Sequence, residues 1–203
     1  MPAKPEHICL FEDQGATRFS PLVYFRPVYN LRCGITSLRQ KTVHRFPRAG
    51  FTLHCRAFLA SYMRHRNPGV LVNEIPGDRC LFVNGRVVAD DRLPRLVSTK
   101  ATGDVVFTSG DTVVAAWVSG PNLARLRRGM DRFLDMNDFS GLPREEVEAE
   151  IATFPWDLVH WNGAQLVADY RTLVGSKRSP VSASSLRRRG VQGVHHIRRP
   201  AVE

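Results

Sequence analysis

The segment spanning residues 10–35 holds the densest set of residues whose types and spacing could do chemistry. An apolar run at residues 7–12 is expected to form a buried strand, and the loop after it bears Arg18, Arg26 and Arg32. Forked guanidinium groups bind phosphate oxygens in pairs, and backbone amides at the start of a following helix add further donors. The spacing predicts a phosphate-binding loop. Ordinary ion pairs or plain solvent exposure would also explain these arginines.

The elements that must position this loop follow from the hydrophobic periodicity of the chain. Apolar residues recur at helical spacing in some segments and form short strand-like runs in others. Strands are expected at residues 51–55 and 80–83 and on both sides of a turn at 109–111. Helices are expected at residues 31–45, 58–63, 121–133, 143–153 and 155–174. This alternation predicts a three-layer, Rossmann-like α/β domain whose mixed, mostly parallel sheet is covered by helices on both faces.

The carboxyl ends of the strands are where ligands bind in sheets of this kind. This rule places the loop at residues 13–30 beside Asn84 and Gly85, which form a tight turn at the end of a buried strand. Asn84 and Gly85 are therefore expected to line a sugar or base pocket.

The composition is that of an ordinary globular protein with 203 residues, of which 43% are hydrophobic. No apolar run approaches the roughly 18 residues that span a bilayer, and the N-terminal segment lacks the apolar core of a secretion signal. A cytoplasmic protein without membrane contact is expected. The cysteines are scattered without CxxC spacing, which favours small buried side chains over disulfides or a zinc site. They are Cys9, Cys33, Cys55 and Cys80.

The net charge of +10 is concentrated at the C-terminal end of the chain. From Arg171 onward eight lysines and arginines stand against one acid, Glu203, so this stretch carries +7 and the first 170 residues about +3. A basic tail can bind phosphate non-specifically, but no recognition motif or interleaved aromatic residue accompanies it. Specific nucleic-acid binding is not favoured, and the small, polar residues after Val174 predict a solvated linker.

The arginine loop resembles the opening loop of the sugar-1-phosphate nucleotidyltransferases, which has the pattern GxGTRLxPLTxxxPKPL. Thr17 and Arg18 stand at the TR pair, and Pro27 stands at the later proline. The segment PLVYFRPVYNLRCGITSLRQK, residues 21–41, is more similar still to the N-terminal domain of bifunctional UDP-N-acetylglucosamine pyrophosphorylase/glucosamine-1-phosphate acetyltransferase-like proteins. The segments LFVNGRVV and FPWDLVHWNGAQLVADY resemble further parts of that domain and come in the expected order.

The resemblance implies a nucleotide-diphospho-sugar transferase fold over residues 1–174. The implied enzyme transfers a nucleotidyl group from a nucleoside triphosphate to a sugar-1-phosphate, with N-acetylglucosamine-1-phosphate as the acceptor that the family suggests, and releases pyrophosphate. Residues 175–203 are expected to be a basic linker that leads toward a β-helix domain absent from this sequence. Whether the chain forms a homo-oligomer is left open.

The same resemblance implies roles for individual residues. Arg18 and Arg26 would be catalytic contacts to phosphate, and the substrate-binding set would comprise Gly15, Thr17, Arg32, Asn84 and Gly85. Active relatives hold Mg²⁺ with an acidic residue at a strand end. Asp111 is the candidate metal ligand here, although a turn-forming aspartate would account for it as well. Trp156 and Asp157 fit either a contact with ligand or an aromatic anchor at the start of a helix.

Departures from the pattern leave a second function open. The two loop glycines fall on Gln14 and Ala16, and the lysine that neutralises phosphate charge falls on Val28. A valine cannot do this work, and a guanidinium is no direct replacement for an ammonium group. The alternative is a catalytically degenerate domain that binds a sugar nucleotide or serves as a scaffold for an acyltransferase partner.

Overall fold

A single mixed sheet forms the centre of the computed structural model, which describes residues 5–98 and 103–175. Its seven strands take the order β3-β2-β1-β4-β6-β5-β7. β6 runs antiparallel to β4 and β5, and the remaining pairings are parallel. The strands are β1 (His7–Phe11), β2 (Gly50–Leu53), β3 (Leu71–Val72), β4 (Arg79–Asn84), β5 (Val105–Ser109), β6 (Thr112–Ser119) and β7 (Arg144–Glu146). The predicted α/β fold with a mostly parallel sheet is confirmed.

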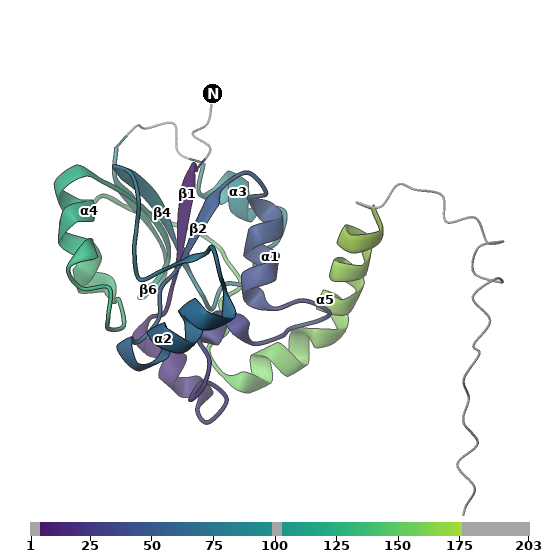
Figure 1. The fold of residues 1–203 in the computed structure, drawn as a ribbon. Coiled ribbons are helices and arrows are strands. Elements are labelled where there is room, and N and C mark those ends of the chain that lie inside the picture. Colours follow the sequence, from purple (N-terminus) through teal and green to yellow (C-terminus); the bar gives the residue numbers. More distant parts are fainter. Residues whose placement is uncertain (1–4, 99–102, 176–203) are drawn as a thin grey trace, which may run out of the picture.

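Helices cover both faces of this sheet. Figure 1 shows α4 on one face and α1 with α3 on the other, while α5 lies outside the α1 side and extends away from the body. The α-helices are α1 (Leu38–Arg45), α2 (Ala57–Arg66), α3 (Leu93–Leu96), α4 (Gly120–Arg127) and α5 (Pro155–Gly175). Short 3-10 helices complete the loops: η1 (Gln14–Phe19), η2 (Val28–Asn30) and η3 (Met136–Phe139).

The period-two pattern of the strands divides the core into two layers. In β1, Ile8 and Leu10 pack on the face that α2 and α3 cover, and Cys9 and Phe11 pack on the face that α4 covers. A third cluster joins η1 to the start of α5 through Phe19 and other buried side chains. The third cluster lies beside the carboxyl ends of β1 and β4, so the loops there are built on a packed base.

The predicted helix at residues 31–45 is wrong in its first half, because α1 begins only at Leu38. Ser37 caps the helix: its Oγ accepts a hydrogen bond from the Gln40 amide, and the Gln40 side chain accepts one from the Ser37 amide. The preceding loop is held instead by α5, where Asp169 accepts bonds from the amides of Ile35 and Thr36. These tertiary bonds replace the helical ones that the periodicity suggested.

The predicted acidic helix at residues 143–153 is also wrong. Residues 144–146 form strand β7, and the chain stays extended up to α5. Glu146 accepts hydrogen bonds from the hydroxyl of Thr108 and the amide of Gly110, which fix it against the edge of the sheet. Helix propensity is a weak preference, and here pairing with an exposed strand edge overrides it.

Several smaller expectations can be compared with the structure. The four cysteines are buried and unpaired, as predicted. Within the described residues no helix is both long and apolar enough to cross a membrane. The basic stretch expected from residue 175 onward lies, from residue 176, outside the described part of the chain.

Candidate functional site

A cavity of about 230 Å³ lies at the carboxyl ends of β1 and β4. In Figure 1 the carboxyl end of β1 lies at the foot of the sheet, opposite the end marked N. Charged residues from loops far apart in the sequence line the cavity, namely Asp13, Arg18, Arg86, Asp111 and Asp135. The position agrees with the rule that ligands of parallel α/β sheets bind beyond the strand carboxyl ends.

A buried ion pair between Asp13 and Arg86 forms the floor of this cavity. The Arg86 guanidinium donates through Nε to Asp13 Oδ1 at 2.7 Å and through Nη2 to Oδ2 at 2.5 Å. Their side chains are only 13% and 5% exposed. Asn84 Nδ2 also donates to Asp13 Oδ2 at 2.9 Å, and Arg86 Nη1 donates to the carbonyl of Ala152. These groups satisfy one another, so Asn84 and Arg86 build the site and are not free to bind ligand.

The two predicted substrate-binding glycines are required by packing. A Cβ on Gly15 would lie 2.5 Å from the guanidinium carbon of Arg86, so the absent side chain is what admits the ion pair. A Cβ on Gly85 would lie 2.9 Å from the Tyr29 ring and 3.0 Å from the carbonyl oxygen of Phe11. Of the two, Gly15 lines the cavity.

Arg18 is the predicted arginine that lines the cavity. It is exposed, forms no ion pair with the described residues, and lies with its guanidinium carbon 5.6 Å from the centre of the Phe154 ring. Its neighbour Thr17 donates its hydroxyl to the carbonyl of Gln14 at 2.8 Å. Thr17 thus stabilises η1, and Arg18 in that helix is the cation that lines the cavity without an ion pair to the described residues.

The structure does not gather the three predicted arginines in one cavity. Arg32 lines a separate cavity of about 360 Å³ between the loop that contains Leu22 and the first turns of α5. Arg26 lines neither cavity; its carbonyl accepts a hydrogen bond from Arg56 Nη2 at 3.2 Å. No ion pair involves Arg18, Arg26 or Arg32 within the described residues, so the ion-pair explanation of these side chains does not hold there.

A buried polar network beside the cavity was missed by the sequence reasoning. Glu12 is fully buried and accepts hydrogen bonds from Arg56 Nε at 3.1 Å and from the Val28 amide at 2.9 Å. Burial raises the pKa of Glu12, although the charge of Arg56 opposes that rise. His54 accepts from the Glu12 amide, and burial lowers the pKa of His54 to about 4. The adjacent acids Glu12 and Asp13, directly after an apolar run, were the signal that could have revealed both networks.

The acids that line the cavity could bind Mg²⁺ only together with phosphate oxygens of a substrate. Asp111 is exposed on the turn between β5 and β6 and makes no hydrogen bond to the described residues. Asp135 is exposed too and accepts a bond from the Asn137 amide. The described residues contain no group of three or more side chains that could hold a metal by themselves. Because Mg²⁺ is commonly held by one or two carboxylates plus phosphate oxygens, Asp111 and Asp135 fit that ion when a triphosphate accompanies it.

Much of the segment at residues 31–41 serves to hold α5. Asp169, on α5, accepts bonds from the amide and hydroxyl of Thr36, both at 2.9 Å, and from Lys41 Nζ at 2.6 Å. Burial alone would raise the pKa of Asp169, but the bonds from Lys41 and Thr36 outweigh it and the pKa is lowered. The Gly34 amide donates to Asn162 Oδ1. This sequence motif therefore has a structural role in joining α5 to the domain.

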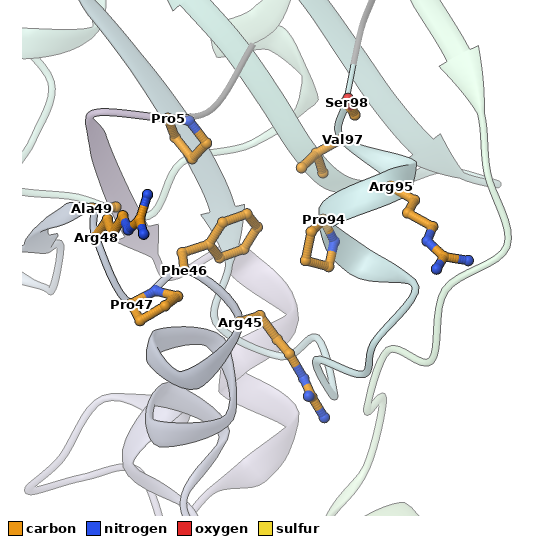
Figure 2. A pocket seen from close by; sticks show the side chains of 10 residues that line it. All are labelled: Pro5, Arg45, Phe46, Pro47, Arg48, Ala49, Pro94, Arg95, Val97 and Ser98. Atoms are coloured by element: carbon orange, nitrogen blue, oxygen red, sulfur yellow. The ribbon is translucent and has the colours of Figure 1, made fainter. Parts of the chain in front are cut away.

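A larger cleft of about 510 Å³ lies at the opposite end of the sheet, where β1 and β2 begin. Figure 2 shows Phe46 and Pro94 facing each other across it, with Arg45, Arg48 and Arg95 around its rim. Arg45 pairs with the exposed Asp91. The walls of this cleft are mainly apolar, and no acidic residue lines the cleft. It therefore lacks the donor set that a metal-bound phosphate requires.

Comparisons with solved structures return proteins of related names at low sequence identity. A protein from Bacillus anthracis assigned as a glucose-1-phosphate thymidylyltransferase, in complex with sucrose, is 12% identical with a TM-score of 0.47, covering 79% of this chain and 95% of that chain. The inositol-1-phosphate CTP transferase from T. maritima is 6% identical with a TM-score of 0.48, covering 77% and 93%. No curated protein matches the chain.

The sequence pattern of the family described as sugar nucleotidyl transferase matches residues 8–178. This match includes the arginine loop, the sheet and helix α5, which together make up nearly all of the described structure. The chain belongs to the sugar nucleotidyl transferase family.

Proposed function

We propose that this domain transfers a nucleotidyl group from a nucleoside triphosphate to a sugar-1-phosphate, with release of pyrophosphate. The observation that carries the proposal is one cavity lined both by Arg18, which forms no ion pair with the described residues, and by the exposed carboxylates of Asp111 and Asp135. A cation for phosphate and acids for magnesium are the two requirements of this chemistry. N-acetylglucosamine-1-phosphate is the acceptor suggested by the resemblance of residues 21–41, and UTP is the corresponding donor.

The reaction is an in-line displacement at the α-phosphorus. An oxygen of the sugar-1-phosphate forms a new bond to the α-phosphorus while the bond to the bridging oxygen of pyrophosphate breaks, and pyrophosphate takes the electron pair. Magnesium, held by Asp111 and Asp135, would supply neutralisation of the phosphate charge. Arg18 binds the triphosphate and stabilises the charge that builds up on the leaving group. Arg26 remains a predicted catalytic contact to phosphate, and Arg32 remains a predicted substrate-binding residue.

Pyrophosphate release tests the proposal. The full chain is incubated with magnesium, each of the four ribonucleoside triphosphates, and either N-acetylglucosamine-1-phosphate or glucose-1-phosphate. We expect release with at least one pair, and we expect Arg18→Gln to lower kcat/KM by about 10²- to 10³-fold because one charge-stabilising donor is lost.

Arg48→Gln is the matched control for this experiment. Arg48 is exposed and forms no ion pair with the described residues, but it lines the cleft at the opposite end of the sheet. The Arg48→Gln variant should leave the rate of pyrophosphate release unchanged. Equal rates for the Arg18 variant and the unmodified chain would contradict the assignment of Arg18.

A second candidate function is a domain that binds sugar nucleotides without turning them over. Val28 occupies the position of the family lysine, and its amide is bound to the buried Glu12. The loop after β1 is wound into η1, so it offers less open backbone than a glycine-rich loop would. This candidate predicts a measurable affinity for a nucleoside triphosphate or a sugar nucleotide together with no pyrophosphate release in the same samples.

A further inference from the structure

A stack of one cation and two rings connects the cavity to the surface of α5. The guanidinium of Arg18 lies 5.6 Å from the centre of the Phe154 ring. The Phe154 ring lies 4.6 Å from the ring of Trp156, with an angle of 13° between the two planes. Arg18 and Trp156 therefore both contact the Phe154 ring. We call these three residues the aromatic ladder.

The ladder is held in place by the same groups that build the cavity. The amides of Thr153 and Phe154 both donate to Asp157 Oδ2 at 2.8 Å, which fixes the turn before α5. The neighbouring Ala152 is bonded in both directions to Arg86, whose guanidinium forms the cavity floor. The Phe154 ring is therefore preorganised beside the site, and it does not depend on a bound ligand for its position.

The outer end of the ladder is open to solvent. Trp156 is 55% exposed although tryptophan has the largest side chain of all residues. Stacking of a base on an aromatic ring is favourable for every nucleobase, because each base has a π face. A nucleotide could use both parts of the ladder: its base could stack on the exposed indole of Trp156, and its phosphates could bind the guanidinium of Arg18.

Resting on the proposed function, we propose that Trp156 is the stacking surface for the nucleobase of the nucleoside triphosphate, while Arg18 holds its phosphates. The distances favour a base over the sugar of the acceptor. In this chain of contacts Phe154 connects Arg18 to Trp156, with its ring centre 5.6 Å from the guanidinium carbon and 4.6 Å from the ring centre of Trp156. In a sugar-1-phosphate the sugar ring is joined to the phosphate through one oxygen. Such a molecule is too short to place its phosphate at Arg18 and its ring on Trp156. In a nucleoside triphosphate the ribose and the inner phosphates bridge this separation.

The test compares a nucleoside triphosphate with inorganic tripolyphosphate, which lacks a base. Affinities of the full chain for UTP, ATP and tripolyphosphate are measured by calorimetry in the presence of magnesium. Trp156→Ala should weaken binding of the best nucleoside triphosphate by about tenfold, within the range known for base–aromatic stacking, and leave tripolyphosphate binding unchanged. Trp156→Phe, which keeps a ring, should retain most of the affinity.

Tyr170→Ala is the matched control, because Tyr170 is a 62% exposed aromatic residue on the same helix far from the ladder. It should leave both affinities unchanged. Unchanged nucleotide affinity in Trp156→Ala, or equal weakening by Trp156→Ala and Tyr170→Ala, would overturn the stacking assignment. A loss of N-acetylglucosamine-1-phosphate binding without loss of nucleotide binding would overturn it as well, in favour of a sugar.

The failure of the stacking assignment is distinguishable from the failure of the proposed function. If the unmodified chain binds neither tripolyphosphate nor any nucleoside triphosphate, the phosphate site itself is contradicted, and the ladder with it. If the unmodified chain binds both and Trp156→Ala makes no difference, the phosphate site stands and only the role of Trp156 is removed. Circular dichroism of each variant checks that α5 keeps its helical structure.

Discussion

The two ends of the sheet carry cavities of opposite character. The cleft at the amino ends of β1 and β2 is the larger, at about 510 Å³ against about 230 Å³ for the cavity at the carboxyl ends. In Figure 2 the guanidinium groups of Arg45 and Arg95 are directed away from the gap between Phe46 and Pro94. The smaller cavity instead combines a buried ion pair with Arg18 and two exposed acids, none of which forms an ion pair with the described residues. Unpaired charge at a strand carboxyl end, rather than volume, marks the candidate site.

The physical basis of this difference is how each end is held together. At the carboxyl ends the Asp13–Arg86 pair is nearly excluded from water and is bonded to the side chain of Asn84 and to the backbone carbonyl of Ala152. At the amino ends Arg45 pairs with an Asp91 side chain that is 90% exposed. A buried pair is rigid and costly to break, whereas an exposed pair contributes little. The carboxyl end can therefore hold a fixed arrangement of charges, as phosphate chemistry requires.

The largest expected effect comes from breaking the buried pair. Asp13→Ala should lower the free energy of unfolding by about 3–5 kcal/mol, because it leaves the Arg86 charge buried without a partner. Asp91→Asn, at the other end of the sheet, should cost less than about 1 kcal/mol. Urea unfolding followed by circular dichroism measures both. Similar costs for the two variants would remove the contrast between the ends.

A somewhat smaller effect is expected from pH. Burial lowers the pKa of His54 from 6.5 to about 4. The unfolded chain then binds more protons than the folded one between these values, so stability is fully present above pH 6.5 and is lost as the pH falls toward 4. The loss amounts to about 3 kcal/mol. His54→Gln should flatten this part of the stability curve, and a curve of unchanged slope would contradict the assignment.

The smallest expected effect concerns glycine. Gly15→Ala should destabilise the fold by about 1–3 kcal/mol, because the new Cβ would lie 2.5 Å from the Arg86 guanidinium carbon, which Asp13 holds in place. Gly163→Ala, in the exposed part of α5 with nothing within 4 Å of the new Cβ, should stabilise by up to about 1 kcal/mol. Thermal unfolding distinguishes the two signs. Tolerance of alanine at residue 15 would show that the pair is free to move.

The sequence predicted the position of the candidate site in the fold more accurately than it predicted which residues line that site. The arginine loop, the turn after β5 and the strand end at Asn84 do meet at one edge of the sheet. Arg32 is placed elsewhere, because the loop around it is held by Asn162 and Asp169 of α5. Those partners are more than 120 residues away in the chain, and no local pattern indicates such a bond.

Other misses have the same origin. Arg86 reads in the sequence as a basic residue where an acid would help, yet it is the partner of Asp13, 73 residues earlier. Residues 143–153 have the composition of a helix, but the open edge of β5 takes part of this segment as a strand. In both cases a distant partner decides the outcome, and local propensity is too weak to oppose it.

The amino-acid sequence by itself indicated the α/β class, most of the strands and helices, the end of the sheet at which the charged loops meet, and a resemblance to the family. Apolar runs and turn residues act over short distances, so they can be recognised along the chain. Only the tertiary structure decided which charges are neutralised and which remain free for a ligand. That depends on contacts between residues far apart in sequence: the fold pairs Arg86 with Asp13 and leaves Arg18 beside Phe154, open to an anion.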